Sequence, residues 1–72
     1  MNDQQLLQKI GHKIANLRRS KGWNQLDLAA RCNFEKANMC RIETGRTNFT
    51  IRTLFIISQA LEVKITALVD VE

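Results

Sequence analysis

Two short apolar patterns between Asn24 and Gly45 constrain the fold of this chain more than any other feature. Each pattern spans about two helical turns, and only the three residues "NFE" separate them. A break this short cannot form a free loop, so the two predicted helices must meet at a tight turn. The second pattern also carries polar and cationic side chains, which a fully buried helix would not contain: Lys36, Asn38 and Arg41.

The residue types across this break have the spacing of a helix-turn-helix, in which two short helices cross steeply over a turn of roughly three or four residues. Taking Gln25 as the first position, the small residue Ala29 falls where the helices approach each other, and Asn33 falls where the turn needs a positive φ. The other constrained positions are apolar. Phe34, Met39 and Ile42 would seat the second helix, and Leu28 and Cys32 complete the buried face. The sequence therefore predicts the motif over about residues 25–44.

The rest of the chain also has helical patterns, which predict a single all-α domain over residues 1–72, a compact bundle of four to five short helices. The first helix is expected over about residues 3–21, and Gly22 would end it. A later helix, capped by Thr50, has the expected inward stripe Ile51, Leu54, Ile57 and Leu61. The final "ITALVDV" predicts either a fifth short helix or an extended tail.

Positive charge is concentrated in the middle of the chain. Between Lys9 and Arg52 lie ten Lys or Arg and three acids, a net charge of +7, whereas the remaining residues sum to −3. A basic block of this kind favours a polyanionic partner, although a solubilising surface would have the same composition.

The sequence offers no metal-ligand or catalytic constellation. Cys32 and Cys40 lie eight residues apart and His12 is the only histidine, so no zinc site can be assembled. We expect the two cysteines to be buried free thiols in a reducing cytoplasm. No metal, cofactor or enzymatic activity is expected. Because the sequence shows no signal peptide and no apolar run of membrane length, a cytoplasmic protein without a membrane partner is expected.

On these residues the chain resembles the Xre family of phage Cro- and repressor-like DNA-binding domains. The resemblance covers Ile10 to Leu68 and rests on "IGHKIANLRRSKGWNQLDLA", "FEKANMCRIETGRTN" and "TIRTLFIISQALEV". Three residues depart from the family pattern: Asn33 stands for the usual turn glycine, Glu35 for the usual Ser or Thr cap, and Phe49 for a common proline. The acid at position 35 lies beside the surface that would face phosphates.

The resemblance implies that a recognition helix over about residues 36–44 enters the major groove of double-stranded DNA. Its base-contacting residues would be Lys36, Ala37 and Arg41. A second set of residues would contact the DNA backbone, or either the backbone or a base: Gln25, Asn38, Thr44, Arg46, Asn48 and Arg52. Arg18 and Glu43 would form an internal ion pair between the first helix and the recognition helix. The alternative for each of these charged residues is that its side chain is exposed to solvent and contacts neither DNA nor another charged residue.

The leading functional hypothesis is a sequence-specific transcription regulator that binds a palindromic operator as a homodimer, without a cofactor. Phe55 and Ile56 fall outside the inward stripe of their helix and predict the dimer interface, unless they pack against the C-terminal tail of their own chain. One alternative is an antitoxin-type or restriction-modification controller-type regulator, which could also have a protein partner. Another is a protein-interaction module of the same fold that does not bind DNA, but the polar recognition helix argues against it.

Overall fold

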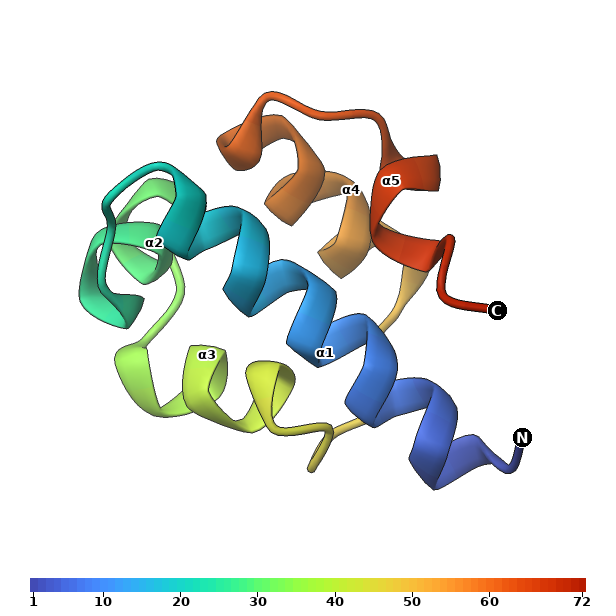
Figure 1. The fold of residues 1–72 in the computed structure, drawn as a ribbon. Helices are drawn as coiled ribbons and strands as arrows, with labels where there is room; N and C mark the ends of the chain where they lie inside the picture. The colour runs from blue at the N-terminus through green and yellow to red at the C-terminus, as the bar shows by residue number, and fades with distance from the viewer.

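The computed structural model describes all 72 residues as five α-helices without a β-strand (Figure 1). In chain order the helices are α1 (Asp3–Ser20), α2 (Gln25–Cys32), α3 (Lys36–Glu43), α4 (Ile51–Leu61) and α5 (Ile65–Val69). The all-α class and the helix-turn-helix are confirmed, and the C-terminal segment forms the fifth helix. None of the five helices combines the length and the apolar character that a membrane span requires.

Local capping fixes both ends of α2. The Asn24 side chain accepts a hydrogen bond from the Asp27 backbone N–H at 2.8 Å, and the Asp27 carboxylate accepts one from the Asn24 N–H at 2.9 Å. Asn33 ends the helix in the left-handed conformation, with φ of 58°. A helix of eight residues is marginal by itself, so these caps set its limits while tertiary packing stabilises it.

The end of α3 depends on Gly45, which has a φ of 72°. The Gly45 N–H donates to the Ile42 carbonyl at 3.2 Å, and the Arg46 N–H donates to the Arg41 carbonyl at 2.9 Å. This is the Schellman arrangement that satisfies the last helical carbonyls. A Cβ on Gly45 would also lie 2.7 Å from the Gln8 backbone nitrogen, so the loop after α3 packs directly against α1.

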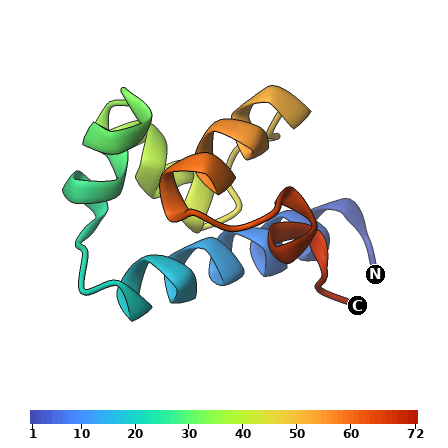
Figure 2. The ribbon, with the colours of Figure 1, turned by 90° about the horizontal axis from the view of Figure 1, so that it is seen from above.

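The long helix α1 runs along the molecule and packs against α2 and α3 as well as α4 and α5 (Figures 1 and 2). The chain termini lie near each other at one end in both views. Gly11 allows the closest approach, because a Cβ there would lie 2.5 Å from the Ile42 carbonyl oxygen of α3. The buried core draws on every helix: Ile10, Ile14, Leu28, Ala29, Cys32, Met39, Ile42, Leu54, Ile57, Leu61 and Leu68.

The inward face of α4 differs from the predicted stripe. Ile51 was expected to be buried, but its side chain lies at the first position of the helix, beyond the core, and the residue is 72% exposed. The buried face consists of Leu54, Ile57, Ser58 and Leu61, so its centre is rotated away from Ile51. The Ser58 hydroxyl is tolerated there because it donates to the Phe55 carbonyl at 2.7 Å.

The two residues predicted for a dimer interface have different environments. Phe55 is 52% exposed. Ile56 is half-buried and packs against the core of its own chain. Ile51 and Phe55, four residues apart, therefore form the exposed apolar stripe of α4.

Candidate nucleic-acid interface

One face of α3 is turned to solvent along its whole length. Its exposed residues are Lys36, Ala37, Cys40 and Arg41, followed by Thr44 at the C-cap. The opposite face buries Met39, Ile42 and Glu43. The three residues predicted to contact bases thus share the exposed face, while Asn38 is half-buried at its edge.

The prediction that both cysteines are buried is wrong for Cys40. Its position, three residues after Ala37 and one before Arg41, places it in the middle of the exposed face. Cys32 is buried in the core, and burial raises the pKa of its thiol to about 11. At neutral pH Cys32 therefore stays protonated and inaccessible, whereas the Cys40 thiol meets solvent.

The N-terminus of α2 presents two backbone N–H groups without an acceptor in the protein, those of Gln25 and Leu26. The N–H groups on either side of them are occupied, because the Asn24 N–H and the Asp27 N–H take part in the capping box. Free N–H groups at a helix N-terminus, together with the helix dipole, favour an anion. The Gln25 side chain points elsewhere, since its Nε2 donates to Glu43 Oε1 at 3.0 Å.

Arg18 and Glu43 form a buried ion pair between α1 and α3. Arg18 Nε donates to Glu43 Oε2 at 2.8 Å, and Arg18 Nη2 donates to Glu43 Oε1 at 3.0 Å. The residues are 7% and 8% exposed, respectively. No buried side-chain nitrogen or oxygen in the structure lacks a hydrogen-bond partner, so the pair is fully satisfied.

The loop after α3 contributes further cations. Arg46, Asn48 and Arg52 are exposed. The Thr44 hydroxyl folds back and donates to the Cys40 carbonyl at 2.8 Å. The structure contains only two ion pairs, Arg18–Glu43 and a Lys21–Glu62 contact of 3.7 Å. The cations of α3 and of the following loop, Lys36, Arg41, Arg46 and Arg52, are therefore uncompensated by acidic partners.

Arg31 has a structural role that the sequence did not reveal. Its guanidinium carbon lies 3.9 Å from the centre of the Trp23 ring, and Lys21 Nζ lies 5.4 Å from the same centre. Trp23 itself is half-buried at the edge of the core. These cations stabilise the α1–α2 turn through cation–π contacts, which separates them from the unpaired cations near α3.

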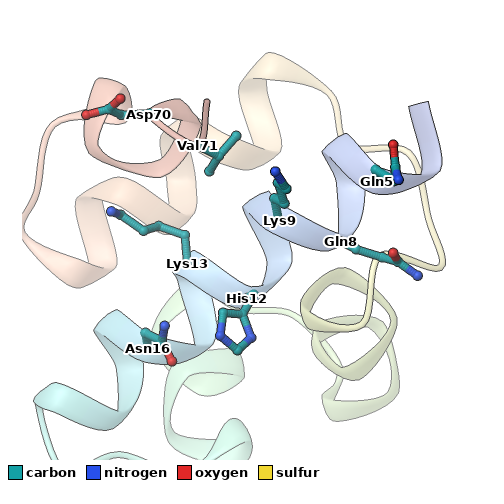
Figure 3. Close-up of a pocket in the computed structure, with 8 residues that line it drawn as sticks. All are labelled: Gln5, Gln8, Lys9, His12, Lys13, Asn16, Asp70 and Val71. Atoms are coloured by element: carbon teal, nitrogen blue, oxygen red, sulfur yellow. The ribbon is translucent and has the colours of Figure 1, made fainter. Parts of the chain in front are cut away.

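A shallow hollow of about 470 Å³ lies between α1 and the C-terminal segment. Figure 3 shows Lys9 and Lys13 pointing from α1 toward the segment that carries Asp70 and Val71. Only one of its eight lining residues is apolar, unlike the mostly apolar sites that bind small molecules. No group of three or more His, Cys, Asp or Glu side chains is placed to hold a metal ion.

A family model described as helix-turn-helix matches residues 14–68 of this chain. An HTH-type transcriptional regulator of Sinorhizobium fredii, y4dJ, is 41% identical over 54 residues, which cover 75% of this chain and 70% of that protein.

Two restriction-modification controller proteins have similar structures. C.AhdI from Aeromonas hydrophila is 26% identical with a TM-score of 0.83, and the match covers 86% of this chain and 94% of that one. C.Esp1396I, solved as a tetramer in complex with its natural 35 base-pair operator, is 34% identical with a TM-score of 0.81. That match covers 90% of this chain and 86% of C.Esp1396I.

Proposed function

The chain belongs to the Xre-type helix-turn-helix family of DNA-binding transcriptional regulators, and on this premise we propose that it binds a pseudopalindromic operator as a homodimer and reads it with α3. Members of this family regulate transcription and are not enzymes, as the sequence predicted for this chain. The observation that carries the proposal is the exposed, uncompensated cationic face of α3. A protein-interaction module would present apolar residues on that face.

In the proposed complex the exposed face of α3 lies in the major groove. Arg41, and with lower preference Lys36, would contact guanine O6 and N7, while the Ala37 methyl would contact a thymine methyl. Cys40 lies between these residues on the same face, so we add it to the groove-facing set.

Phosphate contacts would flank α3 on both sides. On one side the free N–H groups of Gln25 and Leu26 at the start of α2 offer an anion site. On the other side lie the exposed side chains of Arg46 and Asn48 in the loop, with Arg52 in the first turn of α4. Contacts of this kind fix the position of the protein on the duplex, and the base contacts provide the specificity.

Selection of bound sequences from a random DNA pool tests the proposal directly. The wild type should select a motif with two-fold symmetry. Arg41→Ala should lose preference at one position in each half-site, at a cost of about 1–3 kcal/mol. Arg46→Ala, the matched control, should weaken binding to all sequences alike and keep the motif. An unchanged consensus for Arg41→Ala would show that Arg41 does not contact a base.

The exposed thiol allows a chemical test of which face meets DNA. A maleimide at neutral pH should modify Cys40 and spare Cys32, because the Cys32 thiol is buried and its pKa is raised to about 11. The added bulk on α3 should abolish operator binding, and pre-bound operator should protect Cys40 from the reagent. Cys40→Ala should bind DNA and resist the reagent. Full DNA binding by the modified wild type would place the interface elsewhere.

A dimer interface is supported by the exposed apolar stripe of α4. Ile51 and Phe55 are 72% and 52% exposed. Phe55 also borders a groove of about 670 Å³ between the end of α4 and the start of α5, whose apolar lining includes Val63 and Ile65. A second copy would cover this surface. Pairing about a two-fold axis could then present two copies of α3 to successive major grooves about 34 Å apart.

Phe55→Glu should convert the dimer to a monomer, because a carboxylate at the centre of an apolar interface loses its hydration without gaining a partner. Sedimentation at micromolar concentration measures the change, and the mutant should keep its helical circular dichroism. Asn16→Glu on the outer face of α1 is the matched control and should stay dimeric. A monomeric wild type, or a dimeric Phe55→Glu, would contradict this interface.

A controller-type regulator is the second candidate function. It is supported by the similarity to two restriction-modification controller proteins, one of which binds its natural operator as a tetramer. A controller of this kind should select a site upstream of its own gene and of a neighbouring nuclease or methyltransferase gene. If the selected sites do not lie upstream of such genes, the controller-type function is contradicted, whereas the proposal of an operator-binding regulator is unaffected.

A further inference from the structure

The carboxylate of Glu43 is a junction between three parts of the motif. It accepts two hydrogen bonds from Arg18 of α1, at 2.8 and 3.0 Å, and one from the side-chain amide of Gln25 at 3.0 Å. Gln25 is the first residue of α2, and Glu43 is the last residue of α3. The junction therefore joins the start of α2 to the end of the helix proposed to read DNA.

Arg18 also forms a hydrogen bond to the chain just before α2. Its Nη1 donates to the Trp23 carbonyl at 2.8 Å. Trp23 precedes the N-cap Asn24, and Gln25 follows it, so the chain is held on both sides of the cap. The two free N–H groups, those of Gln25 and Leu26, lie directly at this fixed point.

The orientation of the Gln25 amide follows from chemistry. The Glu43 carboxylate is paired with the Arg18 guanidinium, and a carboxylate in such a pair only accepts hydrogen bonds. The amide nitrogen of Gln25 must therefore face Glu43, because its oxygen would meet a second acceptor. This hydrogen bond uses one of the two Nε2 hydrogens and directs the amide toward Glu43.

We propose that Glu43 is a positioning residue for DNA binding, and that Gln25 acts through its amide link to Glu43 instead of donating that amide to a phosphate. This inference rests on the function proposed above. The phosphate at this end of the site would be bound by the backbone N–H groups of Gln25 and Leu26. The link keeps those groups at a fixed offset from the exposed face of α3, and a site loose by about 1 Å loses much of its function.

The test compares Gln25→Met, which keeps the side-chain length and removes the amide, with Gln8→Met at an exposed position whose side chain has no hydrogen-bond partner. Gln25→Met should fold and bind the selected operator about two- to tenfold more weakly than Gln8→Met, which is the lower part of the range for residues coupled by direct contact. Its preference for operator over random DNA should also fall. A purely structural role would lower the melting temperature and leave the affinity of the folded protein unchanged.

Nuclear magnetic resonance separates positioning from direct contact. The side-chain amide signals of Gln25, identified by their loss in Gln25→Met, should shift less than the backbone N–H signals of Gln25 and Leu26 when operator is added to the wild type. A larger shift of the side-chain amide than of these backbone groups would make Gln25 a direct phosphate donor and overturn the inference. Equal operator binding by the two Met variants would also overturn it and leave the proposed function standing. Failure of the wild type to bind any DNA would instead remove the proposed function itself.

Discussion

Raising the salt concentration from about 50 to about 200 mM should weaken binding of the proposed dimer to its operator by about 10³- to 10⁵-fold. The cations on and after α3 have no acidic partners, so each that neutralises a phosphate releases condensed counterions. Two protomers would together make roughly 6–10 such contacts, the number for which this loss is expected. Fluorescence anisotropy of labelled operator at several salt concentrations measures the slope of log affinity against log salt concentration.

Single substitutions assign this slope to one face of the protein. Arg46→Ala should reduce the slope of log affinity against log salt by about one for each protomer. Lys9→Ala, on the α1 side that borders the hollow, should leave the slope unchanged. A flat salt response of the wild type would refute the phosphate contacts, whatever the affinity at low salt.

The parts of the fold that depend on neighbouring residues could be predicted from the sequence. Asn33 takes the left-handed conformation, as predicted, Asn24 and Asp27 cap α2, and Gly45 ends α3. Each of these features needs only residues within one or two turns. Hydrophobic spacing likewise located Met39 and Ile42 in the core, because the period of a helix fixes which residues share a face.

Features that depend on residues far apart in the sequence were not predicted, or were predicted wrongly. Helical spacing suggested burial for Ile51 and residue type suggested it for Cys40, but Ile51 is 72% exposed and Cys40 lies on the exposed face of α3. The contact of Arg31 with Trp23 depends on the angle between α1 and α2, which spacing does not specify.

The same limit applies to the candidate site. The resemblance to the Xre family implied Lys36, Ala37 and Arg41 as base contacts, and all three lie on the exposed face of α3. It gave no sign that Gln25 Nε2 is engaged by Glu43, 18 residues further along the chain. The DNA contacts and the dimer remain predictions, because both require a second molecule.

Removing the Arg18 side chain should destabilise the fold by about 3–5 kcal/mol, because the charge of Glu43 would remain buried without its partner. A chain of this size rarely has more than about 3–5 kcal/mol of stability in total. Arg18→Met alone should therefore be largely unfolded near room temperature. Thermal melts followed by circular dichroism measure the loss. Lys21→Met is the control, since it breaks the Lys21–Glu62 contact, in which Glu62 is 80% exposed, at a cost of about 0–1 kcal/mol.

The double variant Arg18→Met/Glu43→Leu separates stability from positioning. Replacing both charges of a buried pair with apolar residues of similar volume is often neutral or stabilising, so the double variant should fold where each single variant does not. Near-zero, additive effects of the single variants would show that the pair contributes nothing. The folded double variant also lacks the carboxylate to which Gln25 donates. It should therefore bind the operator more weakly than the wild type at equal stability, because the start of α2 is no longer tied to the end of α3.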